Sequence, residues 1–163
     1  MGRIDDSDVE WETLERGETG FRRKRLGAAA GGERIGCSLY ELPPGKRSWP
    51  YHYHAGNEEA ILVRSGSGTL RLAGETYPLS PGDYVALPVG ERGAHRVVND
   101  GEEVLSYLVI STMDDPDVTV YPDSGKFGVY VGAAPGEEGE RSLEGYYRRS
   151  DDVSYWEGEE RAE

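Results

Sequence analysis

Short runs of alternating apolar and polar residues, separated by turns rich in glycine and proline, fill residues 34–131. The first run covers about 34–42 and ends at the turn 43–45, and the longest apolar run covers 103–112. Further strands are expected at residues 59–64, 68–72, 75–79, 83–88, 94–98, 118–121 and 127–131. Runs that recur about every 8–12 residues are typical of a mostly antiparallel sandwich or barrel. The sequence therefore predicts an all-β fold.

Length and charge narrow the class of protein. The chain has 163 residues, which is the size of one domain, and a formal net charge of −13, which disfavours nucleic acid and anionic membranes as partners. Cys37 is the only cysteine, so no intrachain disulfide can form. The N-terminus lacks an apolar signal region, and no run of about 18 apolar residues occurs. We expect a cytoplasmic protein.

The segment 45–66 holds two of the three histidines of the chain. Successive side chains of a strand point to opposite faces, so His52 and His54 are expected to share one face. Residues 55–57 indicate a tight turn into a second strand, and this predicts a hairpin on whose inner face Glu59 lies. Two imidazoles beside a carboxylate form a ligand set for a divalent transition metal.

Each of these residues also has a simpler interpretation. A histidine pair can occupy a solvated strand edge or be hydrogen-bonded in the core, and a Glu-Glu pair is usually exposed. When the two histidines and the glutamate are considered together, the simpler interpretation weakens. A buried Glu59 carboxylate without a partner would cost folding free energy. Glu58 beside it is interpreted as an exposed residue.

The sequence resembles the cupin superfamily through two motifs in order. The first motif is carried by Gly45, His52, His54, Glu59 and Gly66, and its spacing selects Glu59 over Glu58. The second motif is carried by Gly82, Pro88, Gly90, His95 and Asn99. The spacer before His52 is six residues instead of five, and that from Gly90 to His95 is four instead of two. Both departures fall in expected loops, where insertions are tolerated.

This resemblance implies a double-stranded β-helix, or jelly-roll, cupin barrel over residues 34–131. It also implies four metal ligands, His52, His54, Glu59 and His95. The ligand set alone does not select between zinc, manganese, iron and nickel. No P-loop or dinucleotide-binding glycine pattern is present, and the resemblance assigns no catalytic residue.

Several kinds of chemistry are compatible with such a site. The favoured one is oxygen-dependent cleavage or decarboxylation of a small chelating organic acid or sugar-like substrate. A non-catalytic sensor or carrier of a small molecule and a sugar-phosphate isomerase remain alternatives. The isomerase is disfavoured because the strands that flank the histidines offer few inward basic residues for a phosphate. Tyr84 and Tyr107 are candidate pocket walls.

Both ends of the chain extend beyond the expected barrel. Residues 1–33 are predicted to form an N-terminal arm with a basic stretch at 21–26, which we expect to pair with the chain's own carboxylates. Residues 132–163 are predicted to be an acidic, aromatic C-terminal extension that packs on the barrel or on a partner. Uncovered sheet edges and these extensions predict a homodimer.

Overall fold

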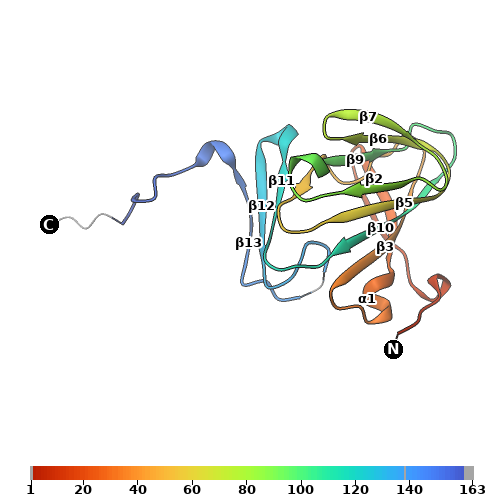
Figure 1. Cartoon of the computed structure of the whole chain (residues 1–163), viewed down its shortest axis with the longest axis horizontal. Helices are drawn as coiled ribbons and strands as arrows, with labels where there is room; N and C mark the ends of the chain where they lie inside the picture. The colour runs from red at the N-terminus through yellow and green to blue at the C-terminus, as the bar shows by residue number, and fades with distance from the viewer. Residues whose placement is uncertain (1, 138, 160–163) are drawn as a thin grey trace.

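The computed structural model, which describes residues 2–137 and 139–159, consists mostly of β-strands. The strands form a barrel with the short helix α1 (Leu26–Ala30) at one end, and the C-terminal segment extends away from it (Figure 1). All ladders between the described strands are antiparallel. The predicted all-β class is confirmed. None of the helices among these residues is long and apolar enough to cross a membrane.

The strands form three sheets. In spatial order, the six-stranded sheet contains β1 (Glu12–Arg16), β2 (Thr19–Arg25), β3 (Ile35–Leu42), β10 (Leu105–Thr112), β5 (Glu59–Ser65) and β8 (Tyr84–Leu87). The four-stranded sheet contains β13 (Leu143–Arg148), β12 (Lys126–Val131), β11 (Asp117–Tyr121) and β4 (Tyr53–His54). The three-stranded sheet contains β7 (Glu75–Leu79), β6 (Gly68–Leu72) and β9 (His95–Val98). Short 3-10 helices lie at η1 (Asp6–Asp8), η2 (Glu91–Gly93), η3 (Pro122–Ser124) and η4 (Arg149–Asp151).

The predicted hairpin between the histidine segment and residues 59–64 is wrong. β4 pairs with β11, whereas β5 pairs with β10 and β8, so the two strands belong to different sheets. The reason lies in the turn between them, where the Ala55 amide donates to the Val118 carbonyl (2.8 Å) and the Gly56 amide donates to the Asp117 carboxylate (2.9 Å). These bonds hold the turn against β11 and carry the chain from one sheet to the other.

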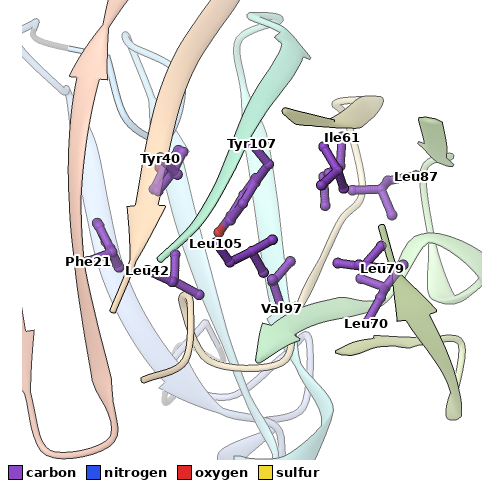
Figure 2. Packing of buried hydrophobic residues seen from close by; sticks show 11 residues of the cluster. Phe21, Tyr40, Leu42, Ile61, Leu70, Leu79, Leu87, Val97, Leu105 and Tyr107 are labelled. Carbon is purple, nitrogen blue, oxygen red and sulfur yellow. The ribbon is translucent and has the colours of Figure 1, made fainter. Parts of the chain in front are cut away.

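The hydrophobic core fills the space between the sheets (Figure 2). Side chains two residues apart point inward, as the alternation predicted: Ile61 and Val63 of β5 are 1% and 2% exposed, and Leu105 and Tyr107 of β10 are 0% and 1% exposed. The Tyr107 ring stacks on Tyr40 with its centre 5.5 Å away. The same alternation decides which other side chains of these strands point into the barrel.

The segment 1–33 contributes β1 and β2 to the six-stranded sheet, where β2 pairs with β3. Its basic stretch forms ion pairs within the chain, as predicted: Arg22 lies 2.6 Å from Glu41, and Arg23 lies 3.0 Å from Glu12. β2 alternates between an outward and an inward face, and the inward face brings arginines toward the barrel interior.

The C-terminal extension divides into two parts. Residues 143–148 form β13, which pairs with β12 along its whole length. Beyond η4 the chain leaves the barrel (Figure 1), and Tyr155 and Trp156 are 84% and 62% exposed. The barrel thus pairs with the first part of the extension, whose side chains stay mostly exposed, and the later aromatic rings lie in solvent.

Asn99, the last residue of the second motif, connects two chain segments through hydrogen bonds of its side chain. It is fully buried, its amide group donates to the carbonyls of Leu42 (2.7 Å) and Glu103 (2.8 Å), and its oxygen accepts from the Gly101 amide (3.0 Å). Asn99→Ala leaves these buried groups unpaired and is expected to lower the free energy of unfolding by about 2–4 kcal/mol in urea titrations. Asp100→Ala, at an exposed neighbour, should change it by less than about 1 kcal/mol. Equal effects of the two substitutions would contradict the assignment.

Candidate metal centre

Backbone pairing between two chain segments brings the three histidines together. His54 belongs to β4 and lies opposite Thr119 of β11. His52, just before β4, exchanges two backbone hydrogen bonds with His95 at the start of β9: the His52 amide donates to His95 (3.2 Å), and the His95 amide donates to His52 (2.8 Å). The predicted alternation therefore places both histidines of the first motif beside the histidine of the second.

A buried asparagine directs the carboxylate of the first motif inward. Asn57 is 2% exposed, and its side-chain oxygen accepts from the Asp114 amide (2.7 Å) and the Thr112 hydroxyl (3.0 Å). This anchor fixes the end of the turn, so that β5 begins with Glu59 on the inner face. Glu58 is exposed and points away, as the motif spacing predicted.

The four side chains meet within a small volume. The Oε2 atom of Glu59 lies 3.5 Å from the Nε2 atoms of both His54 and His95. The His52 ring centre lies 5.2 Å from that of His54 and 4.7 Å from that of His95. The candidate ligand atoms of His52, His54 and Glu59 all lie within 4.8 Å of one another. His95 is outside this group of three and reaches it through Glu59. Bonds of about 2.0–2.2 Å to one ion would draw these atoms closer together.

The imidazole rings are oriented by their second nitrogen atoms. The Nδ1 atoms of His52 and His95 lie 2.7 and 2.9 Å from the carbonyl oxygens of Pro50 and Gly93, and Nδ1 of His54 lies 2.6 Å from Oδ2 of Asp117. A carbonyl or carboxylate oxygen only accepts, so each Nδ1 carries the proton. The Nε2 atoms of the neutral rings then present lone pairs to the shared space, which is the arrangement that metal-binding histidines adopt.

Burial and charge act differently on the three rings. Burial, with the neighbouring His95 and His54, holds the pKa of His52 well below its usual range, and burial also lowers the pKa of His95. Burial opposes protonation of His54 too, but the hydrogen bond to Asp117 and the charge of Glu59 outweigh it and raise the pKa of His54. His52 and His95 are therefore held neutral at neutral pH, the form that a metal requires.

Asp117 is a residue of the candidate site that sequence reasoning missed. It is 1% exposed, contacts Nδ1 of His54 and accepts from the Gly56 amide. Burial alone would raise the pKa of Asp117, but the hydrogen bonds from His54 and Gly56 lower it. The signal that could have found it is alternation, because Asp117 and Thr119, which is 2% exposed, share the inward face of β11.

The site opens into a cavity of about 550 Å³. Its walls carry the phenol groups of Tyr107, Tyr121, Tyr130 and Tyr146, whereas Tyr84 is 65% exposed and does not line it. Tyr121 packs against His52 with ring centres 5.9 Å apart, and the Tyr130 and Tyr146 hydroxyls lie 2.7 Å apart.

Basic residues also reach this cavity: Arg23 and Arg25 from β2 and Arg141 from the loop before β13. They come from outside the strands that flank the histidines, which is why the sequence did not show them.

Comparisons with known proteins agree with this architecture. A family model described as a cupin domain matches residues 38–111. A solved structure from Acidithiobacillus ferrooxidans, provisionally named a sugar phosphate isomerase, is 34% identical, with a TM-score of 0.77, over 91% of this chain and 90% of that chain. A structure from Silicibacter pomeroyi, named a sugar phosphate isomerase from a cupin superfamily, is 24% identical over 94% and 97% with a TM-score of 0.79, a likeness of fold.

A curated relative gives a shorter match. Quercetin 2,3-dioxygenase of Bacillus subtilis is 35% identical over 93 residues, which are 55% of this chain but only 27% of that protein. The chain thus spans about a quarter of this relative. The barrel, the two motifs and the near full-length likeness lead to one conclusion: this chain belongs to the cupin superfamily.

Proposed function

We propose that His52, His54, Glu59 and His95 hold one divalent transition metal and that the protein is a metal-dependent enzyme. The observation that carries this proposal is that each imidazole has its Nδ1 fixed by an acceptor while two Nε2 atoms lie 3.5 Å from one Glu59 oxygen. Nitrogen and oxygen donors of this kind suit iron, manganese, nickel and zinc. A bound ion would supply Lewis acidity and, where it is redox-active, electron exchange with oxygen.

The substrate we propose is a small, chelating organic acid or a sugar-like anion. A cavity of about 550 Å³ lies in the size range of small-molecule sites. Tyr121 and Tyr130 offer hydroxyl groups to a hydroxylated substrate, and burial raises the pKa of both phenols, which keeps them protonated as hydrogen-bond donors. Arg23 and Arg141 bring guanidinium groups to the walls, where each is paired with a carboxylate of the chain, Glu12 and Glu144, and an anionic substrate would exchange with these partners.

Oxygen-dependent cleavage or decarboxylation is the reaction that these residues favour. Isomerisation needs a base that moves a proton between adjacent carbons. Among the described residues that line the cavity, the carboxylates besides Glu59 are Glu33, Glu137 and Glu144. Glu33 is exposed, Glu137 accepts from an amide (3.2 Å), and Glu144 is paired with Arg141 (3.2 Å). The inner wall thus offers phenol donors and few groups that would accept a proton.

Isomerisation of a sugar phosphate is a second candidate, because the arginines of the cavity could hold a phosphate. The Acidithiobacillus relative that matches nearly the whole chain carries that name. Arg23 and Arg25 are side by side on Glu12, at 3.0 and 2.6 Å, and both line the cavity.

Elemental analysis of protein purified without added metal tests the metal, and an oxygen electrode tests the reaction. We expect about one ion per chain. A screen of chelating acids with that ion is expected to show oxygen consumption with product formation. Turnover of sugar phosphates under anaerobic conditions would select the isomerase instead. Tight binding of a small molecule without turnover in either assay would identify a sensor or carrier and refute the enzyme.

A further inference from the structure

The outer edge of the four-stranded sheet carries backbone groups that no strand covers. β13 pairs with β12 on one side only (Figure 1). The Arg149 amide donates to Gly125 of the β12 side (3.0 Å), so by alternation the odd-numbered residues of β13 bond inward. The amides and carbonyls of Glu144, Tyr146 and Arg148 then face outward. Within residues 2–137 and 139–159, no strand other than β12 pairs with β13.

This edge is also where apolar surface gathers. Of the eleven large hydrophobic residues that are exposed in the described part of the chain, six lie between 143 and 156. β13 has the sequence LEGYYR and contains neither lysine nor proline, the residues that commonly protect free edges from pairing. The edge strand β7, by contrast, contains Pro78, and β1 is dominated by charged residues. β13 is therefore better suited to accept another strand than either of these two edges.

The charges of β13 are complementary to the same strand running in the opposite direction. If two copies pair antiparallel about a two-fold axis at Tyr146, Glu144 lies directly opposite Arg148 of the partner subunit, and the converse pair forms as well. The outward backbone groups of residues 144, 146 and 148 then face each other, as hydrogen-bonded pairs require. Opposite charges at directly facing positions stabilise a strand pair. The Glu144 side chain is 44% exposed, so it is accessible despite its contact with Arg141.

We propose that the protein forms a homodimer through antiparallel pairing of β13 with β13, which joins the two four-stranded sheets into one. Such an isologous contact closes on itself and so stops at two copies. Glu144 and Tyr146 also line the metal cavity, so the interface borders the entrance to each site. The proposal does not depend on a bound metal or on catalysis.

Light scattering coupled to gel filtration tests this proposal with a charge swap. The native protein is expected to elute with about twice the chain mass of 18.0 kDa. Arg148→Glu places like charges opposite each other at two positions and should weaken the dimer by about tenfold or more. The double variant Glu144→Arg with Arg148→Glu restores opposite charges and should restore the dimer.

Arg16→Glu at the end of the β1 edge serves as the matched control and should remain dimeric. Circular dichroism would verify that each variant is folded. A monomeric native protein at about 100 µM, well above the dissociation constants of stable dimers, would overturn the proposal. So would a dimer that survives Arg148→Glu unchanged, or a double variant that fails to recover, because each result would place the contact elsewhere.

Discussion

Replacing His54 with alanine is expected to reduce the bound metal from about one ion per chain to below about a tenth under the same purification. The substitution removes one Nε2 donor beside Glu59 and leaves the ionised Asp117 buried without its imidazole partner. Metal content by elemental analysis and affinity by competition with a chelator would measure the loss.

Glu58→Ala is the matched control for this experiment. Glu58 is exposed one position before the inward carboxylate, and the bond that anchors it runs from its backbone amide to the Thr112 hydroxyl (3.0 Å), which alanine keeps. The control should retain full metal content. If both variants keep their metal, the ion is held elsewhere, and the four residues form a hydrogen-bonded polar cluster in an organic-ligand pocket.

Asp117→Asn is expected to weaken metal binding by about 10–100-fold while the barrel stays folded. The neutral amide keeps a hydrogen-bonding group beside Nδ1 of His54 but removes the negative charge that makes this imidazole a stronger donor. The oxygen of an asparagine can still accept from the Gly56 amide, so the turn should survive. Chelator competition would measure the metal affinity, and circular dichroism would show whether the barrel is folded.

Asp123→Asn is the matched control, the same substitution at an aspartate shortly after Asp117 in the sequence. Asp123 lies in η3 and forms an exposed ion pair with Arg71 at 2.6 Å. An exposed pair contributes little to stability, so metal affinity and fold should be nearly unchanged. Should Asp117→Asn behave like Asp123→Asn, Asp117 would be a structural acceptor for the turn and not a residue that tunes His54.

The cavity arginines show why a substrate class is harder to predict than a ligand set. Arg23 and Arg25 lie far from the two motifs in sequence and reach the cavity only because β2 pairs with β3. Arg141 is held in a loop by the carbonyls of Ala133 (3.1 Å) and Ala134 (3.0 Å). Alternation puts Arg23 and Arg25 on one face of β2, but only the pairing with β3 turns that face toward the cavity. The prediction that basic groups are scarce near the site therefore held only for the strands that flank the histidines.

Local alternation was sufficient for the features that depend on one strand at a time. It placed His52 and His54 on one face and identified nine strands from residues 34–131, because side-chain direction in a strand repeats every two residues whatever its neighbours are. Motif spacing then singled out Asn99, whose burial and three hydrogen bonds the structure shows.

Tertiary structure alone decided which strands meet. It separated β4 from β5, joined β1 and β2 to the main sheet, and brought Asp117 to within 2.6 Å of His54 across 63 positions of the sequence. Strand pairing is a choice among many registers, made by the packing of the whole core and by buried polar groups that must find partners. The sequence determined the inward faces and the residue types of the candidate metal site, whereas the acceptors that orient those residues and the walls of the cavity depend on contacts between distant segments.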